Sequence, residues 1–229
     1  MKGKLYGVGV GPGDPELLTL KALRIVKESD VIAVPGEVAE ESIAYIIMKG
    51  AYPDIAGKDC VAISMPMTKD INVLEESHAK GAVGIEKELE AGKQVAFLTL
   101  GDPSIYSTYL YVHNRIIRKG YDAEIISGVP SFCAAAARLG IGLVEKSESL
   151  HVIPASYQIE DSLLLSGTKL LMKAGRKMKA VREQLKAMNV QGYMIENCGM
   201  GNERVYETID KIPDNAGYYS LIIIKEGIK

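Results

Sequence analysis

The segment that most constrains this chain is a glycine-rich stretch near its start, residues 7–19 (GVGVGPGDPELLT). A short apolar stretch that is typical of a buried strand leads into it, and Asp14 and Pro15 suit the N-cap and first turn of a helix. Glycines at alternate positions leave no side chain between the backbone and a ligand. The segment therefore predicts a strand, a tight loop and a helix, with another group lying close against the loop.

This stretch does not fit the dinucleotide-binding fingerprint. That fingerprint requires Gly-x-Gly-x-x-Gly, and counting from Gly7 and Gly9 its third glycine position falls on Pro12. A proline ring suits the close packing of a helix on a strand poorly. The loop is therefore glycine-rich for a different reason.

The composition indicates a soluble globular protein. Of the 229 residues 47% are hydrophobic and the formal net charge is −2, which suits one large or two small domains. No apolar run is long enough to cross a membrane, and the first residues lead into a strand instead of a signal-peptide core, so we expect a cytoplasmic protein. The mild acidity and the lack of a lysine- and arginine-rich block exclude a nucleic-acid partner.

The spacing of the cysteines and histidines does not match that of a metal site. Cys60, Cys133 and Cys198 are odd in number and far apart, so we expect buried free thiols, with neither a disulfide nor a bound metal. His78 falls on the apolar stripe of a predicted helix and the other two histidines stand alone, so we expect packing or surface roles.

The pattern of apolar segments predicts two α/β domains with a cleft between them, residues 1–119 and 120–229. In the first half, apolar runs alternate with helical patterns, as in a mainly parallel sheet that is covered on both faces. The second half has short strands with short connections, which favour a mixed or antiparallel sheet. Strands are expected near residues 5–10, 31–34, 61–63, 95–100, 123–126, 150–153, 168–172, 192–196, 204–206 and 218–224. Helices are expected near residues 18–25, 42–49, 71–89, 105–119, 131–139 and 178–188.

Ligands of open parallel sheets bind beyond the carboxyl ends of the strands. Three loops fall at such ends, residues 10–14, 35–38 and 101–107. The third loop is the best candidate, because Gly101 permits unusual torsions, Asp102 offers an acceptor and Pro103 fixes the turn. Four hydroxyl groups follow closely, on Ser104, Tyr106, Ser107 and Thr108. The alternative is an ordinary capped turn.

Three further segments are less specific. The turn at residues 128–131 leads into a helix of small residues, on which a flat ligand or another backbone can pack; tight packing between the two domains is the alternative. Residues 173–176 and 196–201 each follow an apolar strand, so both can line the same cleft.

Taken together, four motifs in order along the chain resemble those of the tetrapyrrole methylases, a family of enzymes that depend on S-adenosylmethionine. The motifs are residues 7–19 (GVGVGPGDPELLT), 101–103 (GDP), 128–131 (GVPS) and 196–197 (EN). The resemblance covers the whole chain. Residues 65–70 (MPMTKD) and 101–108 (GDPSIYST) look like the branch that methylates C20 of the macrocycle.

The resemblance implies the family's fold of two α/β domains, a homodimer and a tetrapyrrole substrate. It also implies that S-adenosylmethionine lies in the interdomain cleft, against the Gly-Asp-Pro loop and the second domain, while the opening loop shapes the macrocycle trough. Carried over by position, the residues that contact S-adenosylmethionine are Val10, Leu100, Gly101, Asp102, Ile105, Tyr106, Ser107, Thr108, Ser131, Phe132, Met172 and Cys198. The residues expected to bind the substrate are Gly11, Pro12, Asp14, Met65, Met67, Lys173 and Arg204. Tyr106 is the candidate for a residue at the reacting face.

The implied reaction transfers a methyl group to C20 of a cobalt-loaded macrocycle in anaerobic cobalamin biosynthesis and yields S-adenosylhomocysteine. Cobalt enters only as part of the substrate. The alternatives within the family are the metal-free precorrin-2 and a methylase of another ring carbon. The alternative from another class is a non-catalytic protein that binds a nucleotide or a tetrapyrrole.

Overall fold

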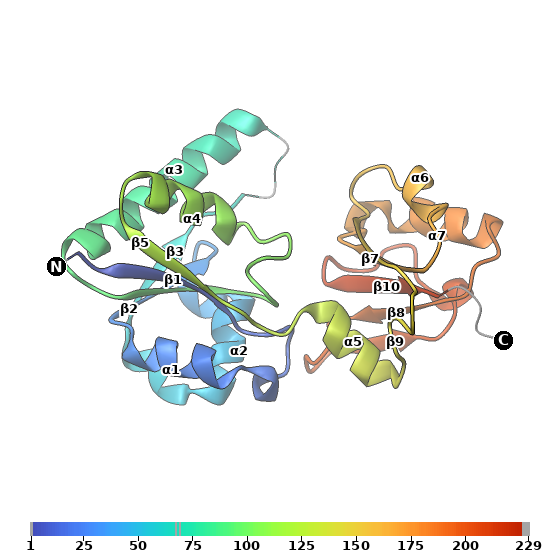
Figure 1. Cartoon of the computed structure of the whole chain (residues 1–229), viewed down its shortest axis with the longest axis horizontal. Helices are drawn as coiled ribbons and strands as arrows, with labels where there is room; N and C mark the ends of the chain where they lie inside the picture. The colour runs from blue at the N-terminus through green and yellow to red at the C-terminus, as the bar shows by residue number, and fades with distance from the viewer. Residues whose placement is uncertain (1, 67, 69, 226–229) are drawn as a thin grey trace. The chain divides into compact units, whose positions relative to one another are not determined.

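The computed structural model describes residues 2–66, 68 and 70–225, and the chain divides into two compact units, Met1–Pro130 and Ser131–Lys229 (Figure 1). Each unit has its own sheet and its own apolar core. The α/β class that the sequence predicts is confirmed.

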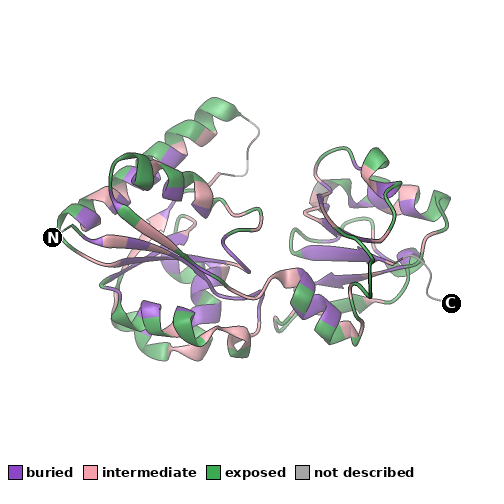
Figure 2. Cartoon of the chain, in the orientation of Figure 1, coloured by how far each residue is buried: buried purple, intermediate pink, exposed green. Residues whose placement is uncertain are grey.

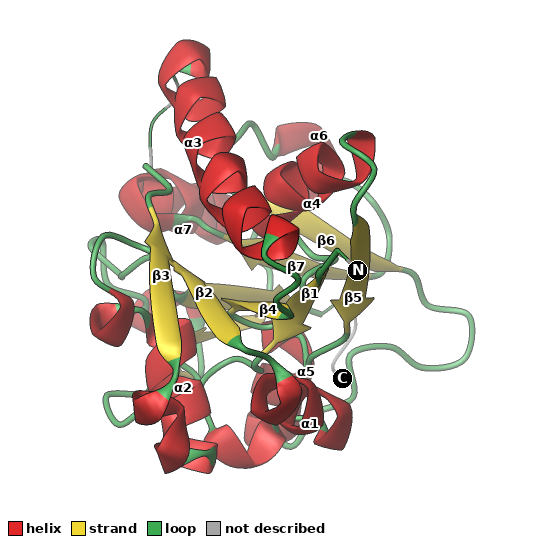
Figure 3. Cartoon of the chain, turned by 90° about the vertical axis from the view of Figure 1, so that its left-hand side faces the viewer, coloured by secondary structure: helices red, strands yellow, loops and turns green. Residues whose placement is uncertain are grey.

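The first unit is built on five parallel strands in the order β3-β2-β4-β1-β5, which Figure 3 shows from left to right. The strands are β1 (Lys4–Gly9), β2 (Val31–Pro35), β3 (Asp59–Ile63), β4 (Val95–Thr99) and β5 (Asp122–Ile126). Every residue of β4 is buried, as Figure 2 shows for the middle of the sheet. Burial on both faces explains why the central strands are apolar throughout.

Helices cover both faces of this sheet. On one face lie α1 (Leu20–Glu28) and α2 (Ile43–Ala51), and on the other α3 (Ile71–Glu90) and α4 (Tyr109–Arg118) (Figure 1). The two faces have separate cores, the first around Val26 and Met48 and the second around Leu89 and Tyr109. Short 3-10 turns lie at Pro15–Leu17, Ala39–Glu41 and Pro53–Gly57.

The neighbouring strands β1 and β4 are followed by helices on opposite faces, α1 after β1 and α4 after β4. In open parallel sheets, ligands bind beyond the carboxyl ends of such a pair of strands. The strand order therefore brings the loop at residues 10–14 to the loop at residues 101–107.

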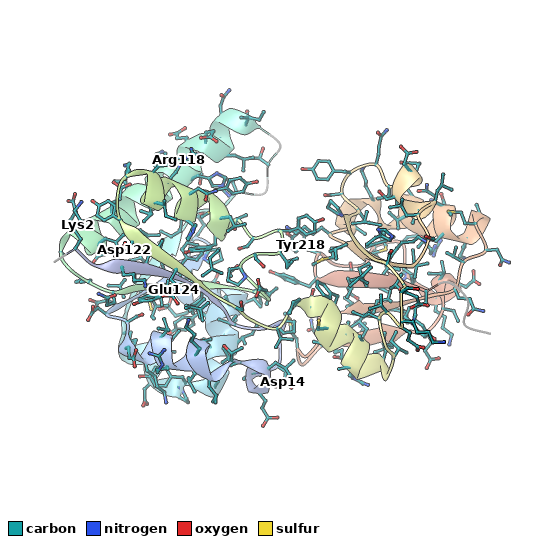
Figure 4. All side chains as sticks on the ribbon, viewed as in Figure 1. Lys2, Asp14, Arg118, Asp122, Glu124 and Tyr218 are labelled. Atoms are coloured by element: carbon teal, nitrogen blue, oxygen red, sulfur yellow. The ribbon has the colours of Figure 1, made fainter. Side chains whose placement is uncertain are left out.

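The glycine-rich loop leads into a short 3-10 turn and not directly into a helix. Asp14, labelled in Figure 4, caps this turn, Pro15–Leu17, by accepting a hydrogen bond from an amide of the turn at 2.9 Å. The helix α1 begins only at Leu20, where the Thr19 hydroxyl accepts a hydrogen bond from an amide of the first turn at 3.1 Å. The cap predicted at Asp14 and Pro15 is therefore confirmed, but it starts a short 3-10 turn, and the second cap at Thr19 starts the regular helix.

The boundary between the two units lies after Pro130, later than the boundary expected after residue 119. The reason is β5, which pairs with β1 and so belongs to the first sheet. β5 lies at the edge of the sheet, and Ile126 is its one buried residue. Its segment therefore lacks the continuous apolar run of the central strands.

The second unit contains a mixed sheet in the order β6-β7-β10-β8-β9. Its strands are β6 (Leu150–Pro154), β7 (Thr168–Met172), β8 (Gly192–Glu196), β9 (Arg204–Tyr206) and β10 (Ser220–Ile224). β6 and β7 are parallel, whereas β10 is antiparallel to both β7 and β8. The helices are α5 (Ser131–Leu139), α6 (Glu160–Leu163) and α7 (Met178–Ala187), with 3-10 turns at Gly175–Lys177 and Ile209–Lys211. The mixed sheet expected from the sequence is confirmed.

Among the residues that the structure describes, no helix combines the length and the apolar character that a membrane span requires. The three cysteines are free, as expected, but the expectation that they are buried is wrong. Cys133 is exposed, because it falls on the side of α5 away from the buried alanines, and Cys60 and Cys198 are half-buried.

Candidate functional site

The carboxyl ends of β1 and β4 are joined by direct backbone hydrogen bonds. The Gly101 amide donates to the Gly11 carbonyl at 2.8 Å, and the Gly11 amide donates to the Gly101 carbonyl at 3.3 Å. Both residues have a positive φ, 76° at Gly11 and 70° at Gly101, which glycine adopts without strain. The glycine-rich loop and the Gly-Asp-Pro loop thus form one structure at the end of the sheet.

The alternate glycines of the opening segment make room for other atoms of this chain. A Cβ atom on Gly9 would lie 2.6 Å from both the Gly101 carbonyl oxygen and the Gly128 nitrogen. A Cβ atom on Gly7 would lie 2.0 Å from the ring of Tyr109. A group does lie close to these glycines, as expected, but at both positions it is protein and not a ligand. We call the meeting of Gly9, Gly101 and Gly128 the glycine junction.

Asp102 connects the Gly-Asp-Pro loop to the turn that follows β5. It is buried, and one carboxylate oxygen accepts hydrogen bonds from the amide and the hydroxyl of Ser104, at 2.8 and 2.5 Å. The other oxygen accepts from the Gly128 amide at 3.0 Å. A carboxylate has about four acceptor sites, and these three hydrogen bonds use three of them. Asp102 therefore orients two loops.

The hydroxyl groups that follow Asp102 have different surroundings. Ser107 Oγ lies 3.0 Å from Thr99 Oγ1 and accepts from the Tyr109 amide at 3.2 Å, so it supports the start of α4. Tyr106 has a φ of 49°, which is uncommon for a residue other than glycine, and is 43% exposed. The helix expected from residue 105 therefore begins at Tyr109, because the backbone is left-handed at Tyr106. Thr108 is also exposed.

The other predicted residues of the first unit lie on or near these two loops. Val10 and Pro12 are buried, and Val10 belongs to the apolar core. Its side chain is therefore occupied by packing, so a ligand contact at Val10 would involve the main chain. Leu100, Ile105, Asp14 and Met65 are half-buried. Met67 lies outside the described residues.

In the second unit, several predicted residues lie at one end of the sheet, where three strands terminate. We call this end the carboxyl edge, and it is distinct from the edge strands β6 and β9. β6, β7 and β8 run in the same direction, so their carboxyl ends meet at this edge, beside the start of β10. Lys173 and Asn197, which directly follow β7 and β8, have positive φ values of 59° and 54°. Backbone strain of this kind is concentrated at functional sites. The edge holds Met172, Lys173, Glu196, Cys198 and Arg204.

The Cys198 thiol at this edge stays protonated at neutral pH. Burial, and after it the carboxylate of Glu203, raises the pKa of Cys198 to about 11. Because the thiolate is the nucleophilic form, Cys198 is unreactive near pH 7. Burial also lowers the pKa of Lys173. Arg204, on the edge strand β9, is exposed.

Ser131 and Phe132 start α5, at the beginning of the second unit. Phe132 is buried and Ser131 is half-buried. The structure thus forms two groups of predicted residues, one at the ends of β1 and β4 and one at the ends of β7 and β8.

Sequence reasoning missed Glu196 as a buried carboxylate and missed the pair Tyr218 and Tyr219. The strand predicted from residue 218 begins at Ser220, so the two tyrosines lie before it. The available signal was two adjacent aromatic residues in front of a wholly apolar segment, which is also the pattern of a longer strand.

The chain belongs to the tetrapyrrole methylases: residues 4–213 match the family described as Tetrapyrrole (Corrin/Porphyrin) Methylases. The resemblance indicated by the four sequence motifs is therefore confirmed.

Two curated relatives match nearly the full length. The chain is 39% identical over 230 residues to the "Probable cobalt-precorrin-2 C(20)-methyltransferase" of Methanocaldococcus jannaschii, covering 97% of this chain and 96% of that protein. It is 31% identical over 235 residues to the "Cobalt-precorrin-2 C(20)-methyltransferase" of Salmonella typhimurium, covering 99% and 98%. Among solved structures, the uroporphyrin-III C-methyl transferase of Thermus thermophilus complexed with S-adenosyl homocysteine has the same fold, with a TM-score of 0.74 at 21% identity over 98% of both chains.

Proposed function

We propose that this chain transfers a methyl group from S-adenosylmethionine to C20 of cobalt-factor II (cobalt-sirohydrochlorin) or cobalt-precorrin-2, in anaerobic cobalamin biosynthesis. The observation that carries the proposal is the similarity over nearly the whole chain to the Methanocaldococcus relative, at 39% identity. The Salmonella relative, whose name states the same reaction, supports the same ring position.

We assign S-adenosylmethionine in the first unit to Val10, Leu100, Gly101, Asp102 and Ile105, with Tyr106, Ser107 and Thr108 nearby, and in the second unit to Ser131, Phe132, Met172 and Cys198. Two structural observations support this assignment. The three hydrogen bonds that Asp102 accepts use three of the about four acceptor sites of a carboxylate, and we assign a fourth site to a hydroxyl or amino group of the methyl donor. Cys198 is held as a thiol, so it does not compete for an electrophilic methyl group.

The chemistry requires positioning more than side-chain reactivity. An electron pair of the ring carbon forms the new bond to the methyl carbon as the methyl–sulfur bond breaks, and the sulfonium becomes a neutral thioether. Holding the two carbons about 3 Å apart and in line can supply several kcal/mol of the barrier. Tyr106, exposed and left-handed at the Gly-Asp-Pro loop, is our candidate for a residue at the reacting face.

The carboxylates of the macrocycle require cations. In the second unit Lys173 and Arg204 are our candidates, since a guanidinium binds a carboxylate through two parallel hydrogen bonds. In the first unit, Lys21 pairs with Glu124 at 2.7 Å and Arg24 pairs with Glu28 at 2.8 Å. In the first unit we assign the macrocycle to the segments around Gly11, Pro12, Asp14, Met65 and Met67.

Isotope labelling tests the proposal. The protein is incubated with methyl-labelled S-adenosylmethionine and, in separate reactions, cobalt-sirohydrochlorin, sirohydrochlorin and precorrin-2, and the new methyl group is located by mass spectrometry and NMR. We expect methylation at C20 of the cobalt complex. Faster turnover of precorrin-2 would assign the metal-free substrate, and methylation at any other carbon would overturn the choice of branch.

Calorimetry with S-adenosylhomocysteine separates the enzyme from a non-catalytic binding protein. We expect a dissociation constant in the micromolar range, which corresponds to about −8 kcal/mol. A protein that binds a nucleotide or the macrocycle but neither S-adenosylmethionine nor its product would belong to the other class.

We also place the enzyme in the cytoplasm, as expected from its sequence, and propose that it is a homodimer, as the family resemblance implies. Light scattering on the purified protein is expected to give twice the chain mass of 24.8 kDa. A mass of one chain at micromolar concentration would contradict the homodimer and leave the proposed reaction unaffected.

A further inference from the structure

Two adjacent tyrosines at the start of β10 remain exposed beside the carboxyl ends of β7 and β8. Tyr218 is 42% exposed and Tyr219 is 40% exposed, whereas every residue of the strand that follows is buried. Tyr218 is labelled in Figure 4. Large side chains with a mostly apolar surface gain free energy by burial, so an exposed pair at a sheet edge marks a surface that another group can cover.

The backbone of this pair is held on both sides. Before it, the Gly217 amide donates to the buried Glu196 carboxylate at 2.5 Å. After it, the Asn197 amide donates to the Tyr219 carbonyl at 2.9 Å, and the Ser220 hydroxyl donates back to the Gly217 carbonyl at 2.7 Å. Burying a carboxylate is costly unless hydrogen bonds compensate it. Glu196 therefore fixes the turn that presents the two rings.

The rings are also fixed relative to each other. Their centroids lie 5.3 Å apart and their planes are at 83°, an edge-to-face arrangement. A ligand that packs on rings already in place loses less conformational entropy than one that must order them. Burial raises the pKa of both hydroxyl groups, so the pair is neutral across the physiological pH range.

Three observations thus meet at one sheet edge: the left-handed residues Lys173 and Asn197, a buried carboxylate that orients a turn, and an exposed pair of neutral aromatic rings. The same edge holds Met172 and Cys198, which the proposed function assigns to the methyl donor. We infer that Tyr218 and Tyr219 bind the purine ring of the methyl donor, one by stacking on its face and the other by packing against its edge, because the two rings lie at 83° to each other. This inference rests on the proposed function and adds two binding residues to it.

The purine suits this pair better than the macrocycle does. The macrocycle is the other flat group in the proposed reaction, but it carries several carboxylates, which the proposed function assigns to the cations Lys173 and Arg204 and not to neutral phenol rings. A purine is neutral and flat, and it stacks on aromatic side chains.

Substitution of each tyrosine by leucine and by phenylalanine tests the inference. The matched control is Tyr111→Leu, which removes a tyrosine of α4 that is 53% exposed. Each variant is titrated with S-adenosylhomocysteine by calorimetry and with sirohydrochlorin by absorbance, and thermal unfolding verifies that it folds. We expect Tyr218→Leu or Tyr219→Leu to raise the dissociation constant for S-adenosylhomocysteine about tenfold. The phenylalanine variants and the control are expected to bind within about threefold of the wild type, because a phenyl ring keeps the stacking surface.

NMR of the unmodified chain gives a readout that does not depend on how the variants fold. The chain contains twelve tyrosines, so ring-labelled tyrosine gives twelve sets of ring signals, in which the phenylalanine variants identify Tyr218 and Tyr219. We expect saturating S-adenosylhomocysteine to shift these two ring signals.

Unshifted signals, together with leucine variants that bind S-adenosylhomocysteine normally, would overturn this inference and leave the proposed function unaffected. Leucine variants that lose affinity for sirohydrochlorin and keep it for S-adenosylhomocysteine would assign the pair to the macrocycle instead. A wild-type chain that does not bind S-adenosylhomocysteine would overturn the proposed function and this inference with it.

Discussion

The Asp102 carboxylate accepts a hydrogen bond from the backbone amide of Gly128 at 3.0 Å, across α4 and β5. The contact ties the loop after β4 to the turn after β5, and β1 lies between these two strands in the sheet. Gly9, at the end of β1, completes the glycine junction. Three strand ends that are distant in the sequence are therefore held at one point by contacts within the chain.

Asp102→Asn tests this contact with a side chain of the same shape. An amide has one oxygen and one NH2 group, so in either orientation an N–H faces the amide of Gly128 or of Ser104. Leaving a buried donor without an acceptor costs about 1–3 kcal/mol, and we expect the free energy of unfolding to fall by this amount in urea denaturation. Ser104→Ala removes only the hydroxyl donor, and we expect a smaller loss of about 0.5–1.5 kcal/mol. An Asp102→Asn protein as stable as the wild type would show that the contact contributes nothing.

Two glycine substitutions should change stability in opposite directions. In Gly9→Ala the new methyl group would lie 2.6 Å from the Gly101 oxygen and the Gly128 nitrogen, and neither backbone atom can move without disturbing the junction. We expect a loss of about 1–3 kcal/mol, as for other overpacked sites. Gly84, inside α3, has nothing within 4 Å of the added carbon. There alanine should stabilise by roughly 0.5–1 kcal/mol through its helix propensity. Thermal denaturation measures both, and equal signs would contradict the prediction.

The pH dependence of stability should include a contribution from Glu124, labelled in Figure 4. Hydrogen bonds from Lys21 and from Lys4, each at 2.7 Å, lower its pKa from 4.5 to about 2. Because the folded value lies below the unfolded one, the stabilisation is complete above about pH 4.5 and is lost as the pH falls towards 2. All three side chains are partly exposed, so solvent screening limits the contribution to about 1 kcal/mol or less.

Glu124→Gln is the corresponding variant. We expect it to be less stable than the wild type at pH 7 and equal to it near pH 2, by urea denaturation, with the difference at pH 7 reduced in 1 M salt. A difference that grows as the pH falls would have the wrong sign and would contradict the assignment.

The reactivity of Cys198 should follow its raised pKa of about 11. At pH 8 about one thiol in a thousand is ionised at such a pKa, against roughly a quarter for an unperturbed cysteine. We expect alkylation by iodoacetamide, followed by peptide mass spectrometry, to be slow at Cys198 and to rise about tenfold per pH unit. Cys133, which is exposed, serves as the internal reference. Rapid labelling of Cys198 at pH 7 would contradict the prediction and the role given to its thiol form.

The parallel sheet of the first unit can be predicted from the sequence because its central strands are buried on both faces. β4 is buried at every residue, so its segment is apolar without alternation. β5 cannot be assigned in this way. It is an edge strand whose place in the first sheet depends on pairing with β1, a contact between distant segments that no local pattern records. The expected domain boundary is misplaced for this reason.

The candidate site is predictable in its residue types more than in its contacts. Asp102 is identified as an acceptor by its loop, but its partner Gly128 depends on the neighbouring positions of β1 and β5. The spacing of Gly7 and Gly9 predicts a close approach, but only the packing of α4 and the strand ends shows what approaches. Met172 and Cys198 meet at one edge because β7 and β8 flank β10, and this order follows from pairing and not from chain order.

The glycine junction limits how this enzyme can be redesigned. Its members come from three separate parts of the chain. A larger side chain at Gly9 or Gly128 would nevertheless meet the backbone of another member. A substitution at one of these positions therefore also disturbs the other two. Libraries aimed at accepting a different macrocycle should therefore leave these three codons fixed. Variation belongs at Met65 and Arg204, which the proposed function assigns to the macrocycle and which lie outside the junction.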